Sequence, residues 1–352
     1  MLTASAMMAL RKLNDAPGLT LVDDAQVPAV PEGHVLIEVR RAGICGTDRH
    51  IYEWDSWSQN RVKLGIATGH EIAGVVVETG VGVKHAKVGQ RVSVEGHIAC
   101  GHCQACRTGN AHICPTVEIV GIDRDGGFAQ FVSVPEENLW PIHDDIPYDI
   151  AAIFDPLGNA VHTVMSAGVS GQTVLITGVG TIGLMAVSVA KAAGASKIIA
   201  VDVDQRRLKI AKDLGADLLL DATTDWAPEA VDFCYGMGPD VLLEMSGHEK
   251  AISAGLAAMK NGGRAALLGL PGGKIQLDLA KLVIFKGATL IGVNGRRMFE
   301  TWYQMENLVL SGKMDFQPII THKIPFAEWE QGFKLMQSGE AIKVILKVSE
   351  GT

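Results

Sequence analysis

Four of the six cysteines of this chain lie in one short segment, HIACGHCQACRTGNAHIC at residues 97–114. Their spacing is C-x2-C-x2-C-x7-C, and Gly101 and Gly109 allow the backbone to turn tightly around a common centre. Four clustered thiols in a reducing compartment favour metal binding, and four thiolates form the closed tetrahedral site of a structural zinc ion. An iron–sulfur cluster also takes four cysteines, and the spacing of the first three resembles one such pattern. Zinc is favoured because nothing else in the sequence indicates a second redox centre; the ligands would be Cys100, Cys103, Cys106 and Cys114.

A second candidate metal site combines residues that are distant in the sequence. Cys45 ends an apolar run in AGICGTD, and His70 and Glu71 open the next one in ATGHEIAG. Thiolate, imidazole and carboxylate suit a catalytic zinc ion, which keeps three protein ligands and one open position. Asp155, in IFDPLGNAVHT, could contribute a further carboxylate. Taken alone, the same residues also fit a buried thiol and a structural histidine.

A glycine turn indicates a nucleotide site. Residues 173–183 read TVLITGVGTIG, so a β-type run leads directly into G-x-G-x-x-G. These glycines permit the tight turn, the close approach of a pyrophosphate and the packing of the following helix, whose N-terminus favours phosphate charge. They are Gly178, Gly180 and Gly183.

The next β-type run, KIIAVD, ends at Asp202. A carboxylate at that place accepts hydrogen bonds from the ribose hydroxyls and repels a 2′-phosphate, which favours NAD over NADP. Arg206 and Arg207 leave the choice open, because a nearby arginine can bind that phosphate or cover the adenine ring.

Two kinds of architecture are expected to position these groups. The runs 34–46, 71–80, 88–96 and 126–135 are rich in Val and Ile and bounded by Gly or Pro, which predicts a barrel-like or sandwich β lobe. From about Ile150 the order strand, glycine turn, long helix and strand predicts a βαβ unit. DVLLEMSG, GGRAALLGLPGG and ATLIGVNG are expected as further buried parallel strands. The final stretch carries helical segments, with KVILKV as an edge strand.

Length and charge exclude several classes of function. A chain of 352 residues is expected to fold as two domains. The net charge of −8 argues against nucleic acid or an anionic membrane as a partner. No apolar run reaches the roughly 18 residues of a membrane span. The N-terminal segment lacks the basic and long apolar regions of a secretory signal, so a cytoplasmic location is expected.

The motifs GICGTD, GHE-x-x-G, the four-cysteine segment, DPLGNAVHT and GVGTIG, in this order, resemble the zinc-dependent medium-chain dehydrogenase/reductase family over essentially the whole chain. The resemblance implies an α/β protein with a GroES-like β-rich catalytic domain at 1–156, which includes the structural zinc lobe. It further implies a Rossmann domain with a doubly wound parallel sheet at 157–297 and a return to the catalytic domain at 298–352. A homotetramer and the cofactors NAD and zinc, one catalytic and one structural ion per subunit, are also implied.

The resemblance also assigns roles to residues. Cys45, His70 and Glu71 match the catalytic zinc positions, and the four clustered cysteines match the structural ones. Thr47 and His50 match a relay that carries the hydroxyl proton to solvent. Some relatives have Glu where Asp155 stands, and the shorter carboxylate could reach the metal through water. Besides the three glycines and Asp202, the implied cofactor contacts are Ile182, Arg207, Leu268, Gly269, Leu270, Val293 and Asn294.

HIYEWDSWSQ, LEMSG, GRRMFETWY and PIITH resemble the branch of the family that oxidises the C3 hydroxyl of L-threonine with NAD. His97 matches a position associated with substrate choice. Asp155 or Glu71 could face the ammonium of an amino acid, and Arg296 or Arg297 could clamp its carboxylate. A polyol or secondary-alcohol dehydrogenase remains the alternative, since it would use the same metal, relay and cofactor. A non-catalytic redox or metal sensor would have no need for the complete proton relay.

Overall fold

The computed structural model describes residues 6–350. It consists of two compact units, one formed by Met1–Asp155 together with Ile320–Thr352 and the other by Pro156–Ile319. The family resemblance predicts that the chain returns to the first domain at 298. In the structure, residues 298–319 belong to the second unit, where α10 (Glu300–Leu310) buries Trp302 and Met305.

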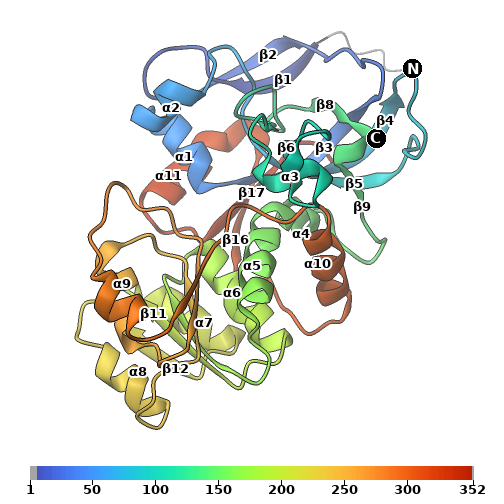
Figure 1. Cartoon of the computed structure of the whole chain (residues 1–352). Helices are drawn as coiled ribbons and strands as arrows, with labels where there is room; N and C mark the ends of the chain where they lie inside the picture. Colours follow the sequence, from blue (N-terminus) through green and yellow to red (C-terminus); the bar gives the residue numbers. More distant parts are fainter. Residues whose placement is uncertain (1–5, 351–352) are drawn as a thin grey trace. The chain divides into compact units, whose positions relative to one another are not determined.

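The first unit is organised around a seven-stranded mixed sheet. Its strand order is β16-β17-β3-β4-β5-β9, with β8 paired to β3 off this path. Figure 1 shows the first and last parts of the chain together in this unit, the blue β3 near the red β17. The strands are β3 (His34–Ile44), β4 (Glu71–Thr79), β5 (Arg91–Val94), β8 (Phe131–Pro135), β9 (Leu139–Pro141), β16 (Ile320–Pro325) and β17 (Lys343–Lys347).

The prediction that KVILKV forms an edge strand is wrong. β17 pairs in parallel with β16 on one side and antiparallel with β3 on the other. An interior strand is covered on both sides, which explains its nearly continuous apolar sequence. As a consequence Lys343, the first residue of β17, is only 1% exposed.

The core of the first unit lies between this sheet and the helices that pack on it. Val35, Ile37 and Val39 alternate along β3 and are fully buried, as expected for one face of a strand. Trp329 and Phe333 of α11 pack into the same cluster. The other elements of this unit are β1 (Ala6–Arg11), β2 (Thr20–Gln26), α1 (Gly46–Glu53), α2 (Ser56–Arg61), α4 (Tyr148–Ala152) and α11 (Trp329–Gln337), with 3₁₀ turns at Glu136–Asn138 and Phe326–Glu328.

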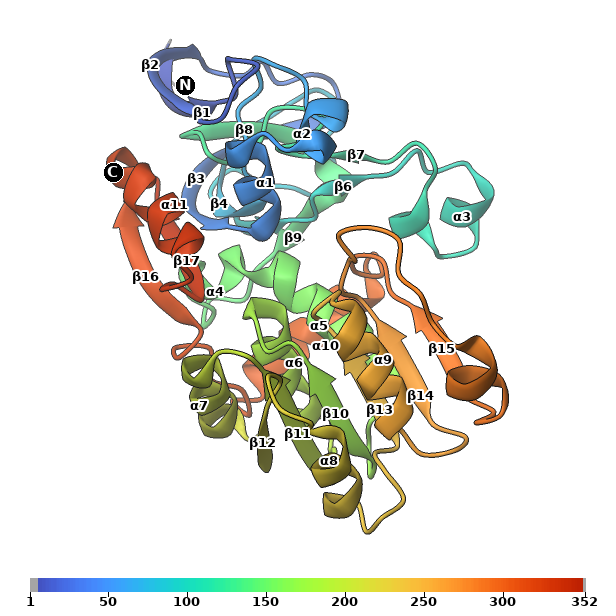
Figure 2. The ribbon, with the colours of Figure 1, turned by 90° about the vertical axis from the view of Figure 1, so that its left-hand side faces the viewer.

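The four-cysteine segment forms a separate lobe of the first unit. It connects the two strands of a short ladder, β6 (His97–Ile98) and β7 (Glu118–Ile119), and contains α3 (Gln104–Arg107) and a 3₁₀ turn at Ala111–Ile113. Figure 2 shows α3 at the far end of this ladder. Within residues 6–350, no helix combines the length and the apolar character that crossing a membrane requires.

The second unit contains a six-stranded parallel sheet in the order β12-β11-β10-β13-β14-β15. Every pairing is parallel, and the order reverses between β10 and β13, as in a doubly wound sheet. This confirms the predicted Rossmann architecture. The strands are β10 (Thr173–Thr177), β11 (Lys197–Asp202), β12 (Leu218–Asp221), β13 (Val241–Glu244), β14 (Arg264–Leu267) and β15 (Thr289–Gly292).

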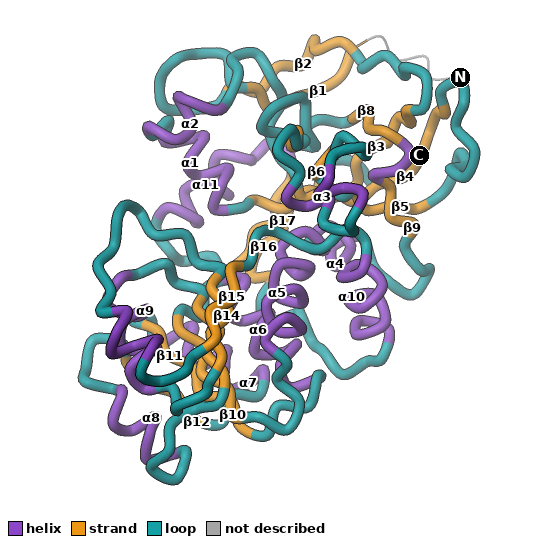
Figure 3. Tube along the Cα trace, in the orientation of Figure 1, coloured by secondary structure: helices purple, strands orange, loops and turns teal. Residues whose placement is uncertain are grey.

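Helices cover both faces of the parallel sheet. Figure 3 shows α8 and α9 on one side of the strands and α5 and α6 on the other. Trp226, Ile252 and Leu256 pack against the strands on the first side. The helices are α5 (Phe154–Ala167), α6 (Thr181–Ala192), α7 (Gln205–Leu214), α8 (Ala227–Phe233) and α9 (Glu249–Ala258), with a π-helical turn at Ala280–Ile284.

The strand predicted at ATLIGVNG forms, but its predicted burial is wrong. Among the strands that the structure describes, β15 pairs with β14 alone and therefore ends the sheet. Leu290 is 37% exposed, and Ile284 and Phe285 nearby are 69% and 81% exposed. The apolar sequence therefore does not reflect burial within this chain.

Candidate metal centre and nucleotide site

The structure brings Cys45, His70 and Glu71 together in the first unit. Cys45 follows β3, and Glu71 is the first residue of β4. These strands pair antiparallel with Gly43 opposite Glu71, so the end of β3 lies beside the start of β4. One donor atom from each of the three residues lies within 4.8 Å of the other two. This spacing allows a single ion to contact a thiolate, an imidazole and a carboxylate.

Only glycine fits at position 43, because the Glu71 carboxylate occupies the place that a side chain would take. A Cβ at position 43 would lie 2.0 Å from Oε2 of Glu71. On its other side, Glu71 forms a buried ion pair with Lys343, whose Nζ donates to Oε1 at 2.5 Å and to the Ile44 carbonyl at 2.9 Å. Burial would lower the pKa of Lys343, but the Glu71 carboxylate raises it above its ordinary value. The ammonium therefore stays charged.

Asp48 supports the same site from α1. Its Oδ2 accepts a hydrogen bond from the backbone N–H of Cys45 at 2.8 Å, which closes a capping box at the start of the helix. Its other oxygen lies 3.7 Å from Nδ1 of His70, and Asp48 is fully buried. Burial by itself would lower the pKa of His70, but Asp48 and Cys45 raise it to about 10.

These contacts test whether the residues fit a metal ion. The pocket stabilises positive charge strongly enough to hold a proton on a buried imidazole, and the buried Nδ1 of His70 makes no hydrogen bond among the described residues. A divalent cation would take the place of that proton and use the same negative groups. The donor set therefore fits zinc. Asp155, in the first turn of α5, is buried and its charge also raises the pKa of His70, but it lies outside the group of three.

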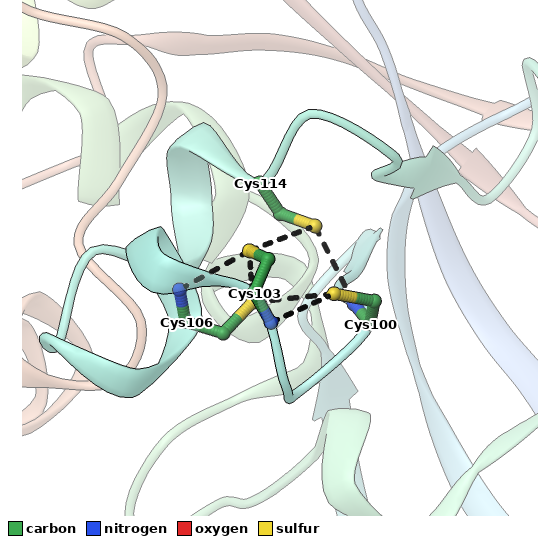
Figure 4. A group of neighbouring side chains, drawn as sticks. All are labelled: Cys100, Cys103, Cys106 and Cys114. Atoms are coloured by element: carbon green, nitrogen blue, oxygen red, sulfur yellow. Dashed lines mark hydrogen bonds between the residues drawn. The ribbon is translucent and has the colours of Figure 1, made fainter.

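The four clustered cysteines also converge on one point, as Figure 4 shows. Sulfur–sulfur distances are 3.5 Å for Cys103–Cys106 and 3.9 Å for both Cys100–Cys106 and Cys103–Cys114. A tetrahedron with zinc–sulfur bonds of about 2.3 Å has edges of about 3.8 Å. A cluster of several irons would hold the sulfurs farther apart, so this geometry favours a single zinc ion.

Backbone geometry builds the cysteine lobe. Gly101 and Gly109 adopt φ values of 75° and 77°, which other residues rarely adopt. The backbone N–H groups of Cys103 and Cys106 point at the sulfurs of Cys100 and Cys103, at 3.4 and 3.5 Å. Hydrogen bonds from backbone N–H groups lower the pKa of Cys100 to about 6, whereas burial and the neighbouring thiols raise the pKa of Cys106 to about 12, so a metal ion would have to displace protons from part of the cluster.

The predicted relay residues lie on α1, next to the candidate metal centre. The Oγ1 of Thr47 is 3.9 Å from the sulfur of Cys45. His50 lies one turn later, and three-residue spacing places the two side chains on the same face of the helix. The His50 side chain is 58% exposed, which suits the outer end of a path to solvent.

The glycine turn of the second unit has the predicted form: β10 ends at Thr177 and α6 begins after Gly180. A Cβ at Gly178 would lie 2.7 Å from Ser246, and one at Gly183 would lie 2.0 Å from the Gly178 carbonyl oxygen. A Cβ at Gly180 would meet no atom within 4 Å. Packing therefore requires the first and third glycines, whereas the middle one fits the close approach of a phosphate.

Asp202 anchors this turn. Its Oδ2 accepts a hydrogen bond from the backbone N–H of Val179 at 2.7 Å, and Oδ1 accepts one from Asp204 at 2.9 Å. Asp204 in turn holds Arg206 at 2.8 Å, with Arg207 3.8 Å away, and its hydrogen bond with the Arg206 side chain lowers its pKa to about 2. Both arginines therefore already face a negative charge, which weakens their attraction for a 2′-phosphate.

The other predicted cofactor positions lie at the carboxyl ends of the strands. Residues 268–270 follow β14, and Val293 and Asn294 follow β15. In a parallel sheet these ends share one edge with the glycine turn, which is where such folds bind ligands. Asn294 is exposed, Leu270 is 91% exposed and Ile182 is half-buried at the start of α6.

Two family models match the chain. A zinc-binding dehydrogenase model covers residues 181–311, and an alcohol dehydrogenase GroES-like model covers residues 31–144. The chain is 47% identical to an L-threonine 3-dehydrogenase of Symbiobacterium thermophilum, with 97% of this chain and 98% of that protein covered. An L-threonine 3-dehydrogenase of Bacillus subtilis is 46% identical with the same coverage. The chain belongs to the zinc-dependent medium-chain dehydrogenase/reductase family.

The crystal structure of 2R,3R-butanediol dehydrogenase from Bacillus subtilis resembles this dehydrogenase with a TM-score of 0.87 at 27% identity, over 97% of this chain and 100% of that one. The same fold thus serves relatives that are named for different alcohol substrates. The pocket residues must therefore decide the substrate of this dehydrogenase.

His97 and Arg296, the two residues predicted to contact the substrate of the dehydrogenase, lie in different units. Nδ1 of His97 is held at 2.9 Å by the fully buried Glu95, which fixes the ring in the first unit. Arg296 is 1% exposed in the second unit, and a Cβ at Gly158 would lie 2.8 Å from its stem. Arg297 pairs with Glu300 at 3.1 Å. Contact of any of these residues with substrate stays a prediction.

Sequence reasoning missed several residues that shape the metal centre of this dehydrogenase. Lys343 is one of them, because a lysine at the start of a strand is usually exposed and a single sequence does not show that this one is buried. Gly43 and Asp48 carried no signal in a single sequence. Tyr52, an aromatic residue of α1, packs in the core of the first unit. Its ring stacks on that of Phe333, with ring centroids 5.0 Å apart.

Proposed function

We propose that this dehydrogenase oxidises the C3 hydroxyl of L-threonine to 2-amino-3-oxobutanoate with NAD. The observation that carries the proposal is the convergence of Cys45, His70 and Glu71 in a chain that is 44–47% identical to several L-threonine 3-dehydrogenases. When bound, zinc supplies Lewis acidity toward an alcohol oxygen and the nicotinamide ring supplies the hydride acceptor. The residues of this chain bind, orient and remove the proton.

The proton leaves the hydroxyl through α1. The Thr47 hydroxyl accepts a hydrogen bond from the substrate hydroxyl and passes a proton toward His50. The exposed ring of His50 then exchanges that proton with water. Each turnover removes a hydride and a proton from the alcohol, and the proton appears in solvent. The fully buried Asp48 holds the backbone N–H at the start of α1, which keeps the helix in place relative to Cys45.

Charge in the first unit supports an amino acid as substrate. Asp155 is buried near the candidate metal centre and could face the ammonium group, whereas the alternative, Glu71, belongs to the metal centre and is already paired with Lys343. His97, on the same unit, is the candidate for contact with the rest of the substrate. NAD is favoured over NADP because Asp202 and Asp204 place two carboxylates at the end of β11.

The test is a steady-state comparison of L-threonine with sorbitol and 2,3-butanediol, with NAD and with NADP. We expect kcat/KM for threonine with NAD to exceed the other values at least tenfold, and a chelator to abolish turnover. Cys45→Ser should remove activity and leave NAD binding intact, whereas Cys234→Ala, in the core of the second unit, should keep activity. A higher kcat/KM for butanediol would favour the alternative function, and activity in Cys45→Ser would refute the metal assignment.

We also infer that the protein forms a homotetramer in the cytoplasm. β15 leaves an unpaired edge of backbone groups with no charged residue between Thr289 and Gly292, and Ile284 and Phe285 are exposed beside it. A second copy pairing at this edge would extend the sheet and cover these side chains. Light scattering should give a tetramer mass, and Leu290→Lys should reduce it; an unchanged mass would place the contact elsewhere. A reducing compartment suits the four thiolates of the cysteine lobe.

A further inference from the structure

His50 does not stand alone on α1. Its Nδ1 lies 2.7 Å from Oδ2 of Asp55, a residue just beyond the helix. The other oxygen of Asp55 caps α2, since Oδ1 accepts from the backbone N–H of Ser58 at 2.9 Å and from its hydroxyl at 3.0 Å. One carboxylate therefore joins the imidazole to the start of the next helix.

This contact fixes the tautomer of His50. The hydrogen bond from the Ser58 backbone lowers the pKa of Asp55, and the contact with His50 lowers it further. An ionised carboxylate can only accept hydrogen bonds, so Nδ1 of His50 must carry the hydrogen. The lone pair of the neutral ring is then on Nε2, which is the atom that can accept a proton.

An unusual backbone conformation brings Asp55 back to His50. Trp54 ends α1 in the left-handed region, with φ 56° and ψ 49°, and the N–H groups of Trp54 and Asp55 both point at the His50 carbonyl, at 2.9 and 3.4 Å. For a residue other than glycine this conformation costs about 1–2 kcal/mol. The indole offsets the cost, because its Nε1 donates to Asp15 at 2.5 Å, Lys12 lies 4.1 Å from the ring centroid, and Trp54 is 6% exposed.

Among the described residues, a second carboxylate near His50 is already paired. Glu53, on the same helix, accepts from Arg49 at 2.7 Å and from Gln337 of α11 at 3.3 Å. From α2, the aromatic ring of Trp57 meets the imidazole edge-on with centroids 6.3 Å apart. Asp55 is therefore the carboxylate that bonds the ring and faces the charge of an imidazolium.

We propose that Asp55 is a positioning residue that makes His50 a proton acceptor at Nε2 and stabilises the imidazolium formed there. The proposal rests on the proposed function, in which His50 receives the proton released from the hydroxyl. The proton binds Nε2, Nδ1–H remains bonded to the Asp55 carboxylate, and Nε2 then returns the proton to water. His50 thus gains one proton and loses one proton in each turnover, and its ring returns to the neutral form.

The test replaces Asp55 by Asn. Asn caps a helix as well as Asp does, so α2 should keep its start and Ser58 its hydrogen bonds. With its oxygen held by Ser58, the amide of Asn would present N–H to Nδ1 and force the hydrogen of His50 onto Nε2. We expect NMR of labelled histidine to show this change of tautomer.

For threonine oxidation, Asp55→Asn should lower kcat roughly tenfold near pH 7, less than the hundredfold or more that loss of a general base costs, while KM for NAD changes little. Glu53→Gln is the matched control, because it removes a nearby carboxylate that does not bond the ring, and it should keep the wild-type tautomer. In a His50→Ala background, Asp55→Asn should have no further effect.

Two results would overturn the proposal: an unchanged tautomer and kcat in Asp55→Asn, or an equal loss of kcat with His50 already removed. Failure of the proposed function looks different. In that case the wild-type protein would not oxidise threonine, whereas the NMR measurement would still decide whether Asp55 sets the tautomer of His50.

Discussion

Replacing Lys343 by Met tests how the buried charges of the metal centre are balanced. Lys343 is 1% exposed and Glu71 is fully buried. The two side chains form an ion pair, and Lys343 also donates to the Ile44 carbonyl. Met has nearly the same length, so the change removes charge and hydrogen bonds with little loss of volume. Breaking such a pair by removing one partner costs about 3–5 kcal/mol.

The loss should depend on the metal. Without an ion, the Glu71 carboxylate of Lys343→Met loses its ion-pair partner and keeps only the nearby His70 imidazolium, so most of the cost applies. A divalent ion would supply the missing positive charge and restore part of the stability. If it restores about 2 kcal/mol, linkage requires zinc to bind roughly 30-fold more tightly to the variant than to the wild type.

The measurements are zinc competition with a chromogenic chelator and hydrogen exchange of β3, β4 and β17 in urea, with and without zinc. Hydrogen exchange reports the local stability of these strands. This is needed because a chain with two units does not have a single free energy of unfolding. The matched control is Glu71→Gln/Lys343→Met, which removes both charges and should recover most of the apoprotein stability. Equal destabilisation of the zinc-bound and zinc-free forms, with unchanged zinc affinity, would refute the reasoning.

Three further changes test other parts of the structure. Gly43→Ala should lower the free energy of unfolding by about 1–3 kcal/mol, because the new Cβ would lie 2.0 Å from Glu71. Gly46→Ala is the control and should not lower it, because a Cβ there would meet no atom within 4 Å. Urea denaturation measures both free energies. Cys103→Ser should remove one of two zinc ions per subunit in metal analysis and lower the melting temperature, and retention of both ions would contradict the assignment of the lobe. Burial lowers the pKa of His162, so below pH 6.5 the unfolded state binds a proton that the native state does not. The native protein should therefore lose up to about 1.4 kcal/mol of stability per pH unit as the pH falls below 6.5, relative to His162→Gln, and parallel pH profiles would contradict this.

Local spacing explains which predictions the sequence could support. The four cysteines of the lobe lie within fifteen positions, so a few turns and two glycines suffice to bring their sulfurs together. The glycine turn likewise joins one strand to the helix that follows it. In both cases neighbours in the chain are neighbours in space, and residue type with spacing predicts the geometry.

Strand neighbours could not be predicted in the same way. KVILKV and ATLIGVNG are both short apolar runs, yet β17 is interior and β15 is an edge. A run of apolar residues is compatible with burial inside the sheet and with burial against another chain. The pairing of β16 with β17 is what distinguishes them, and it is a property of the folded chain.

The sequence by itself determined the cysteine lobe, the nucleotide-binding turn with Asp202, and the kind of residues available for a catalytic metal. The tertiary structure alone decided that Cys45, His70 and Glu71 meet, that Lys343 reaches Glu71 from 272 positions away, and that Asp55 bonds His50. The physical reason is that the first group depends on interactions within one turn or one loop. The second depends on strand pairing and on a left-handed turn stabilised by the packing of Trp54, and both of these exist only after the chain has folded.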